Sequence, residues 1–261
     1  MFKKIINNIL FTTTTFSRIP VKKVPYSKEN TEYLYLVLPL VGLIYGIILF
    51  ASAYGITKFV NNNVISSLMI IGISLFVSGG IHVDGFLDTT DAFKSYRERA
   101  QKAEILKDSL LGAFALIHFT ILIIMMICVY YFIFQFNAIY LFLVFPILSR
   151  TLALILIVKN EILPGDMLRD MLSDIAKKYG IIASVIYMIL VALISYYFAS
   201  TTGLIITIIM IITGLIYLKY FTWQYKIHLD YLSGDLCGHT ICMLEALLPA
   251  SAIIFMLMNN M

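Results

Sequence analysis

Long runs of apolar residues, separated by short polar segments, make up most of this chain. The runs lie at residues 34–59, 64–81, 110–135, 138–158, 179–199, 203–221 and 239–258. Each is close to the roughly 20 residues that an α-helix needs to cross the hydrocarbon core of a bilayer. The pattern therefore predicts an all-α, polytopic integral membrane helix bundle with about seven transmembrane helices. We expect residues 1–261 to form one transmembrane domain.

The first 33 residues follow a different pattern. The segment 1-MFKKIINNILFTTTTFSRIP-20 has a basic start but lacks the continuous apolar core and the small-residue cleavage site of a signal peptide. On a helix, Phe2, Ile5, Ile6, Ile9 and Leu10 share one face. We therefore predict a retained amphipathic helix that lies on the inner membrane surface, within a cytoplasmic segment 1–33.

Composition and charge agree with a lipid environment. Of all residues, 61% are hydrophobic and only 13% are charged, whereas soluble domains carry about 25% charged residues. In a seven-span topology nearly all Lys and Arg residues fall on one side, and cytoplasmic loops are enriched in these residues. We expect a multi-pass protein of the cell (inner) membrane with its N-terminus inside and its C-terminus outside. No feature indicates that the protein binds nucleic acid, and the sequence leaves open whether it forms a homo-oligomer.

Three aspartates follow the second apolar run, in 79-GGIHVDGFLDTTDAF-93. Asp84, Asp88 and Asp91 stand at i, i+4 and i+7, so on a continuous helix they share one face. Carboxylates this close repel one another unless a cation lies between them. Because oxygen ligands favour Mg²⁺ or a similar hard ion, the stretch predicts a metal site. The alternative is a solvated helix end.

A second acidic pair precedes the third run. Glu104 and Asp108 stand at i and i+4 in 103-AEILKDSLLGAF-114, with Lys107 between them. We expect the two acids to complete the metal site from the next helix and Lys107 to supply a cation for phosphate. A surface pair without a ligand is the alternative.

Two ionisable residues lie within apolar runs. Arg150 and Glu245 are each several residues inside a predicted span, where a charge is costly and usually functional. The sequence leaves two interpretations: the two residues pair across helices, or Arg150 reaches an anionic phosphate in a cavity that opens from the cytoplasm.

The histidines add candidate chemistry. His82 precedes the acidic face by two residues and is a candidate metal ligand or proton acceptor, as is Asp91. His239 opens the last run beside 233-SGDLCG-238 and is a candidate binding residue. We expect His118 and His228 to serve in packing or at the membrane interface.

Several stretches spread along the chain carry a family resemblance. They are 16-FSRIP-20, 38-LPLVGLIYG-46, 79-GGIHVDGFLDTTDAF-93, 104-EILKDSLLGAFA-115, 147-ILSR-150, and 234-GDLCG-238 followed by Glu245. Together they resemble the cobalamin synthase family, also called adenosylcobinamide-GDP ribazoletransferase or cobalamin 5'-phosphate synthase. The acidic stretch, at its distance from 104-EILKDS-109, is the specific part of the resemblance.

The resemblance implies a Mg²⁺-dependent phosphotransferase in a late step of cobalamin (vitamin B12) biosynthesis. A ribose hydroxyl of α-ribazole, or of its 5'-phosphate, attacks the corrinoid-side phosphate of adenosylcobinamide-GDP, and GMP leaves. Phosphoryl transfer depends mainly on positioning and on neutralising charge, which suits the acidic and basic residues above. We accordingly predict catalytic Asp91, His82, Lys107 and Arg150; metal ligands Asp84, Asp88, Asp91, Glu104 and Asp108; and substrate-binding Arg150, Asp235, His239 and Glu245.

Two other classes of protein share parts of the pattern. A CDP-alcohol phosphotransferase-like lipid enzyme also holds metal with spaced aspartates, but its D-G-x2-A-R arrangement would need Ala and Arg where Asp88 and Thr89 stand. An ion or metal transporter would need charged or strongly polar residues across the whole membrane. The outer halves of the runs offer little of that kind beyond Lys58.

Overall fold

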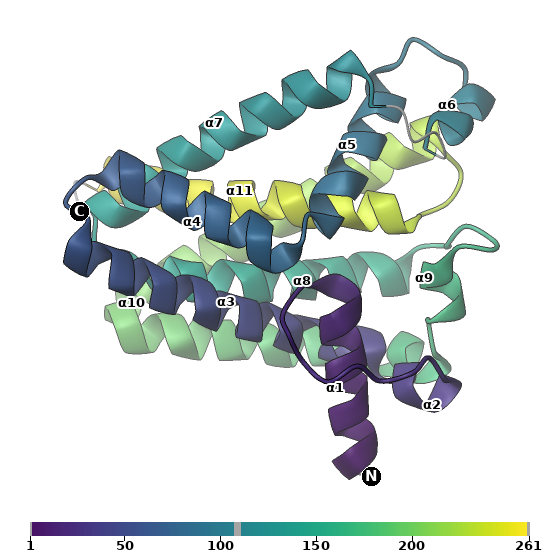
Figure 1. The fold of residues 1–261 in the computed structure, drawn as a ribbon, viewed down its shortest axis with the longest axis horizontal. Coiled ribbons are helices and arrows are strands. Elements are labelled where there is room, and N and C mark those ends of the chain that lie inside the picture. Colours follow the sequence, from purple (N-terminus) through teal and green to yellow (C-terminus); the bar gives the residue numbers. More distant parts are fainter. Residues whose placement is uncertain (1, 107–110, 260–261) are drawn as a thin grey trace.

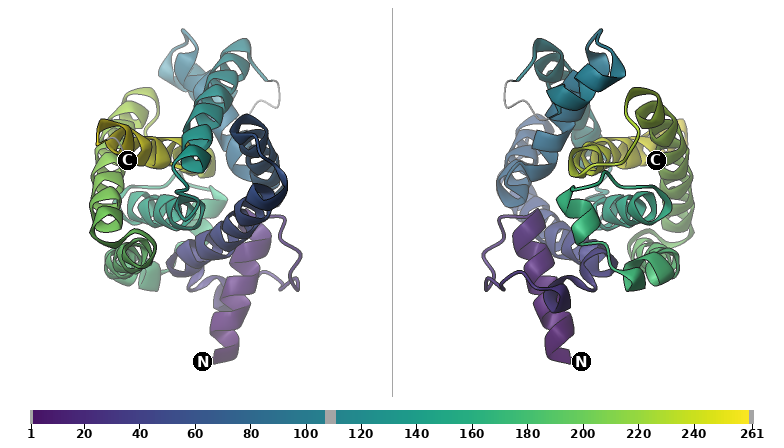
Figure 2. Two further views of the ribbon diagram at one scale, coloured as in Figure 1. Left: turned by 90° about the vertical axis from the view of Figure 1, so that its left-hand side faces the viewer. Right: turned by 90° about the vertical axis from the view of Figure 1, so that its right-hand side faces the viewer.

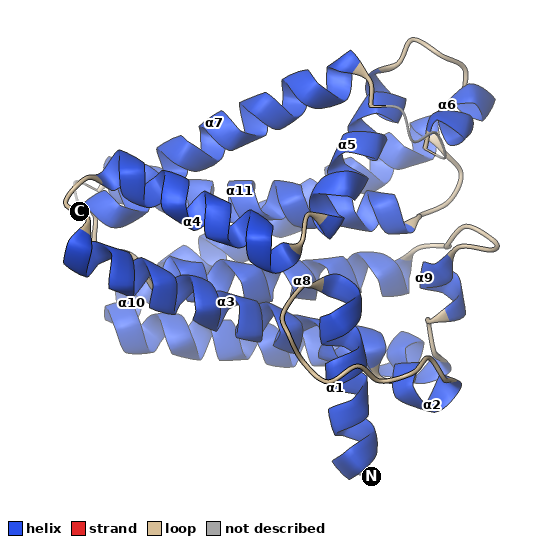
Figure 3. Cartoon of the chain, in the orientation of Figure 1, coloured by secondary structure: helices blue, strands red, loops and turns tan. Residues whose placement is uncertain are grey.

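The computed structural model describes residues 2–106 and 111–259, and nearly all of its regular structure is helical (Figure 3). The helices are α1 (Phe2–Phe16), α2 (Lys28–Thr31), α3 (Leu34–Phe59), α4 (Asn63–Ser78), α5 (Ile81–Lys94), α6 (Arg99–Ile105), α7 (Ala113–Gln135), α8 (Leu141–Lys159), α9 (Met167–Asp170), α10 (Asp174–His228) and α11 (Gly234–Met258). Within the described ranges, strand pairing is limited to one isolated bridge between Ile162 and Leu232. The predicted all-α fold is confirmed.

The number of membrane-crossing segments depends on α10. Five helices, α3, α7, α8, α10 and α11, are long and apolar enough to cross a membrane, and the bent pair α4 and α5 raises the number to six. The backbone of α10 is non-helical at Ala199 and Ser200. Near the start of α10, a Cβ atom on Gly180 would lie 2.7 Å from Val158 at the end of α8. Phe198 stacks on Tyr140 at the start of α8, and the Tyr225 hydroxyl donates to Asn160, again at the end of α8. Thus α10 reverses direction, and counting its halves separately gives the predicted seven segments.

The second predicted span is shorter than the sequence suggests. Its helix, α4, stops at Ser78, and Gly79 and Gly80 follow with φ of 68° and 77°, a left-handed conformation that favours glycine. The chain then leaves at 94° as α5. Because α5 carries the three aspartates, we assign the second crossing in the count of seven to α4 alone and place α5 outside the membrane-spanning segments.

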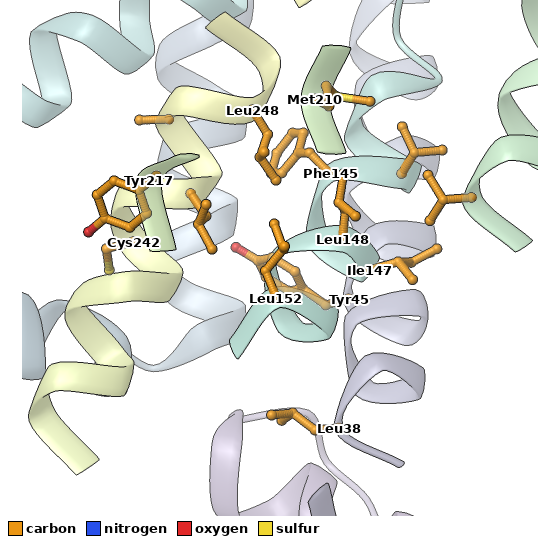
Figure 4. Close-up of a cluster of buried hydrophobic side chains, with 14 of the residues drawn as sticks. Leu38, Tyr45, Phe145, Ile147, Leu148, Leu152, Met210, Tyr217, Cys242 and Leu248 are labelled. Atoms are coloured by element: carbon orange, nitrogen blue, oxygen red, sulfur yellow. The ribbon is translucent and has the colours of Figure 1, made fainter. Parts of the chain in front are cut away.

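The buried centre of the bundle is α8, which packs against α3, α10 and α11 (Figure 2). Leu148 and Leu152 of α8 meet Met210 of α10, Leu248 of α11 and Tyr45 of α3 in one apolar cluster (Figure 4). These side chains interdigitate along the length of the spans, and the cluster fixes the mutual positions of the helices that carry the site.

Two glycines let α3 approach α8 closely. A Cβ atom on Gly42 would lie 2.5 Å from the Pro146 carbonyl oxygen, and one on Gly46 would lie 2.6 Å from that of Leu143. Glycines four residues apart on one helix face are typical of tight packing between membrane helices, because association there depends on van der Waals contact.

The N-terminal helix lies across the direction of the spans (Figures 1 and 2). The Asn8 side chain joins it to the chain before α3: it donates to the Glu29 carbonyl at 3.0 Å and accepts from the Tyr33 N–H at 2.7 Å. This orientation is the one expected for a helix on a membrane surface.

The connecting segments gather unequally at the two ends of the bundle. Helices α2, α6 and α9 lie at one end, and the described C-terminus lies at the other (Figure 1). We call the first the loop-rich end. It also carries the segments 160–166 and 229–233, which the bridge between Ile162 and Leu232 joins.

Candidate active site

The three aspartates of the acidic stretch lie on one side of α5, as the sequence predicts. The helix is continuous from Ile81 to Lys94. Asp84 is exposed and Asp88 and Asp91 are half-buried, while the opposite residues are buried. The i, i+4, i+7 spacing therefore produces an acidic face at the loop-rich end.

A close helix crossing brings this face to the start of α11. A Cβ atom on Gly85 would lie 2.6 Å from the Asp235 carbonyl oxygen, and one on Gly238 would lie 3.4 Å from the Gly85 Cα. The two backbones meet because neither glycine has a side chain. The crossing places the predicted binding residue Asp235 beside the aspartates of α5.

The structure adds to the site a third segment, which the sequence analysis missed. Asp166 lies just after the bridge in which Leu163 N–H donates to the Leu232 carbonyl (2.9 Å). Its carboxylate accepts from Leu168 N–H at 2.7 Å and from Gly234 N–H at 3.2 Å. Asp166 is thereby fixed beside Asp235. The sequence feature that could have indicated Asp166 is the repeated Gly-Asp pair, 165-GD-166 and 234-GD-235.

Carboxylates from three segments line one cavity. Asp84, Asp166 and Asp235 contribute to a cavity of about 170 Å³, with His82 in its wall. We call it the deep cavity. Asp166 and Asp235 also line an adjoining space of about 760 Å³ between α6, residues 163–166 and residues 229–235, which we call the cleft. A polar group in the deep cavity can thus belong to a larger molecule in the cleft.

The carboxylates affect one another electrostatically. Partial burial, together with the charges of Asp84, Asp235 and Asp91, raises the pKa of Asp88 to about 6. Among the described residues, none of the ion pairs includes Asp84, Asp88 or Asp235. The cluster therefore carries excess negative charge that a cation would neutralise.

The residues fit one kind of metal site and not another. Within residues 2–106 and 111–259, no three His, Cys, Asp or Glu side chains converge closely enough to enclose a metal ion. A closed protein cage of the calcium or zinc type is therefore not present in this part of the chain. Mg²⁺ usually keeps several waters and takes only one or two carboxylates together with substrate phosphates, which the acidic cluster can supply.

Asp91 differs from the other two aspartates of α5. Its carboxylate lies against Gly112, the residue that precedes α7, in space that any side chain at position 112 would occupy. A carboxylate at the N-terminus of a helix is favoured by the exposed backbone N–H groups. The contact gives Asp91 a role in positioning α7 in addition to any ligand role.

The second predicted acidic pair is described only in part. Glu104 is exposed on the short helix α6, which ends at Ile105, and it lines neither the deep cavity nor the cleft. Lys107 and Asp108 lie outside the described residues. That these residues complete the metal site from the next helix stays a prediction; α6 carries Glu104, and α7 begins at Ala113.

Arg150 and Glu245 form a buried ion pair between α8 and α11. The Arg150 guanidinium also donates to the Ser149 hydroxyl at 3.0 Å and lies 4.8 Å from the centre of the Tyr45 ring. The residues are 3% and 7% exposed, so each charge has its partner inside the bundle. The sequence allowed either an ion pair across helices or contact of Arg150 with a phosphate. The structure shows the ion pair, and contact with substrate stays a prediction.

The two candidate histidines occupy different places. His82 is buried, stacks on Phe16 and lines the deep cavity with Asp84. His239 instead lies on the other flank of α5, between the rings of Phe86 and Phe221. The structure therefore brings His82 to the carboxylates and separates His239 from them.

Comparison with known proteins assigns the chain to a family. The sequence model of the family described as "Cobalamin-5-phosphate synthase" matches residues 8–253. An adenosylcobinamide-GDP ribazoletransferase of Clostridium perfringens (strain SM101) is 29% identical over 246 residues, which cover 94% of this chain and 95% of the relative.

Two shorter matches carry the same name. The proteins of Halalkalibacterium halodurans and Clostridium botulinum (strain Langeland) are 35% and 38% identical over 120 and 116 residues. The first match covers 46% of this chain and 45% of the relative, and the second covers 44% and 46%. No solved structure matches the chain. The family match over nearly the whole length places this chain, a transferase with several apolar membrane-type helices, in the cobalamin-5-phosphate synthase family.

Proposed function

We propose that this protein joins adenosylcobinamide-GDP to α-ribazole, or to α-ribazole 5'-phosphate, in a Mg²⁺-dependent reaction at the loop-rich end of the bundle. The products are adenosylcobalamin, or its 5'-phosphate, and GMP. The observation that carries the proposal is the convergence of Asp84, Asp166 and Asp235 on one cavity that adjoins a larger cleft. The names of the relatives supply the two substrates.

The cleft suits the GDP portion of the larger substrate, and the corrinoid ring would extend beyond it. Its volume of about 760 Å³ lies within the range of roughly 300–1,000 Å³ in which proteins bind small molecules. The diphosphate of adenosylcobinamide-GDP, bound there, would lie next to the aspartates of the deep cavity. A cleft with an acidic floor favours such a diphosphate only when cations accompany it.

The bond changes are those of a phosphoryl transfer. The ribose hydroxyl oxygen of α-ribazole bonds to the corrinoid-side phosphorus, and the bond from that phosphorus to the bridging oxygen of the diphosphate breaks. GMP leaves with the bridging oxygen, and the hydroxyl proton passes to a carboxylate of the cluster or to His82. Positioning by the protein supplies much of the rate enhancement in such reactions.

One or two of Asp84, Asp88 and Asp235 would hold Mg²⁺, with water and phosphate oxygens completing its coordination. Bound there, the ion would neutralise charge on the phosphate oxygens. Asp166 is held by two backbone N–H groups, so it would keep the α11 start and the 160–166 segment in register around the ion. The predicted roles of Glu104, Lys107, Asp108 and Asp91 remain part of this proposal.

A defined reaction tests the proposal. Purified protein in detergent is incubated with adenosylcobinamide-GDP, α-ribazole and Mg²⁺, and GMP is measured by chromatography. We expect GMP to form only when both substrates are present and to disappear after addition of a chelator. GMP formation at the same rate without α-ribazole would indicate hydrolysis, and equal rates with the chelator would contradict the metal requirement.

We further propose that the loop-rich end faces the cytoplasm of a cell whose inner membrane holds the protein. The support is the distribution of basic residues, which favour the cytoplasmic side. In this orientation the cleft is open to nucleotide substrates in the cytoplasm, and α1 lies on the inner surface.

A further inference from the structure

A second cavity lies on the flank of α5 that faces away from the aspartates. It measures about 280 Å³ and is formed by α5, α7, α10 and α11. From α5 it receives Phe86, Thr90, Phe93 and Lys94. We call it the aromatic cavity. Neither the deep cavity nor the cleft shares any of its lining residues in the described parts of the chain.

Stacked rings form one wall of the aromatic cavity. The His239 ring lies 5.0 Å from Phe86 on one side and 5.0 Å from Phe221 on the other, with interplanar angles of 9° and 10°. The Tyr217 hydroxyl lies 3.3 Å from His239 Nδ1. Parallel rings held in this way provide a flat, preformed surface at little conformational cost.

The cavity also contains polar groups that the protein itself does not use. Thr90 is only 4% exposed, and its hydroxyl has no hydrogen-bond partner among the described residues. His118 Nδ1 lies 2.8 Å from the Phe114 carbonyl, which can only accept, so Nδ1 carries the proton. In the neutral ring Nε2 is then an acceptor. An unpaired hydroxyl is unfavourable in a protein interior. Because Thr90 also lines the cavity, a ligand group there is one partner that would satisfy it.

The lining selects the chemical class of this ligand. Among the described residues that form the cavity, only Lys94 carries a formal charge. One positive charge is too little to neutralise a phosphate or diphosphate group. Aromatic walls with a few donors and acceptors instead suit a neutral planar heterocycle. The volume is well below that of the cleft, so the cavity suits a small ring system and not a macrocycle.

We propose that the aromatic cavity binds the planar heteroaromatic base of α-ribazole, the nucleoside acceptor; this inference rests on the function proposed above. Lys94 lines the cavity and lies three residues after Asp91, so the two are neighbours on the surface of α5. A base in the cavity would therefore direct its ribose around the edge of α5 toward the carboxylates. The two substrates would approach α5 from opposite flanks.

Two neighbouring threonines provide a matched test. Thr89 is buried and lacks a partner for its hydroxyl in the same way as Thr90, but it lines neither the aromatic cavity nor the other described cavities. We expect Thr90→Val to weaken the binding of α-ribazole by roughly 3- to 10-fold, the loss of one neutral hydrogen bond. Thr89→Val should bind like the parent. The measurement is isothermal titration of the full-length protein in detergent with α-ribazole alone.

A second pair of variants fills the cavity from α7. Ile121 lines it, whereas its neighbour Ile124, also exposed on α7, does not. We expect Ile121→Trp to weaken α-ribazole binding at least about tenfold through steric exclusion, and Ile124→Trp to leave it unchanged. Because both substitutions lie on the lipid-facing helix surface, each protein is also checked by thermal unfolding.

The outcomes separate this inference from the proposed function. GMP formation by the parent enzyme tests the function without reference to the cavity. Parent-like binding of α-ribazole by both Thr90→Val and Ile121→Trp would overturn the cavity assignment while the function stood. If these variants bound GMP more weakly but α-ribazole normally, the assignment would also be overturned, because the cavity would then bind guanine. Selective loss of α-ribazole binding, with GMP binding unchanged, supports it.

Discussion

At the scale of single residues, the candidate site is a set of carboxylates from three segments far apart in the sequence. Asp84 comes from α5, Asp166 from the segment before α9 and Asp235 from the first turn of α11, and all three line the deep cavity. Each belongs to a rigid helix or is fixed by backbone hydrogen bonds, as a site for phosphoryl transfer requires.

We expect Asp84→Asn, Asp166→Asn and Asp235→Asn each to lower the rate of GMP formation by about 10²-fold or more. The substitution keeps size and hydrogen bonding but removes the charge that would hold a cation beside the phosphates. Asp174→Asn is the control, because Asp174 is fully exposed at the start of α10. Parent-like turnover by all three variants would show that the cluster does not take part in the reaction.

The raised pKa of Asp88, about 6, predicts how metal binding depends on pH. Below pH 6 the neutral carboxyl is favoured, and a metal ion must displace its proton to bind. We therefore expect the affinity for Mn²⁺, used as a paramagnetic substitute for Mg²⁺, to fall by about tenfold between pH 7 and pH 5. Electron paramagnetic resonance of free Mn²⁺ measures this. Asp88→Asn should bind Mn²⁺ more weakly and without this pH dependence; a pH-independent parent would contradict the argument.

The buried pair of Arg150 and Glu245 makes a separate prediction about stability. Removing one partner leaves the other charge buried and uncompensated, so Arg150→Gln and Glu245→Gln should each destabilise the fold by about 3–5 kcal/mol. The double variant Arg150→Met/Glu245→Leu removes both charges and should recover most of the loss. Thermal unfolding in detergent measures the stability of the parent, the two single variants and the double variant. Single variants with parent-like stability but lost activity would instead favour a direct role with substrate.

At the scale of elements, the site depends on how closely α5 crosses α11. The bend after α4 turns α5 by 94°, and Gly85 and Gly238 allow its backbone to contact that of α11. The acidic face therefore reaches Asp235 only while the crossing stays tight.

We expect Gly85→Val to abolish most GMP formation. Its Cβ would lie 2.6 Å from the Asp235 carbonyl oxygen, so the two helices must separate. Gly72→Val is the matched control: it adds the same side chain to α4, where nothing lies within 4 Å of the new Cβ. Turnover of the purified proteins is compared at equal folded concentration. Equal activity of the two variants would show that the site tolerates a looser crossing.

At the scale of the whole molecule, we predict that seven crossing segments place the two chain ends on opposite sides of the membrane. The reversal of α10 at Ala199 and Ser200 is essential to this count. A reporter enzyme fused after Met261 should score as periplasmic or extracellular, and one inserted after Lys28 as cytoplasmic. A cytoplasmic score at Met261 would contradict both the topology and the proposed orientation of the cleft.

The sequence by itself determined the features that depend on local periodicity. Uninterrupted apolar runs required a helical membrane bundle, because backbone groups in lipid must be satisfied within each segment. The i, i+4, i+7 spacing placed Asp84, Asp88 and Asp91 on one face of a helix, as the structure confirms.

Tertiary structure alone decided which distant residues meet. Asp166 was not predicted, because its place in the site depends on the bridge between Ile162 and Leu232. His239 was predicted to bind substrate, but its position on the flank of α5 away from the aspartates is set by the crossing of α5 and α11. Such contacts depend on helix crossings and on loop pairings between residues far apart in the sequence. A pattern that repeats every few residues carries no information about them.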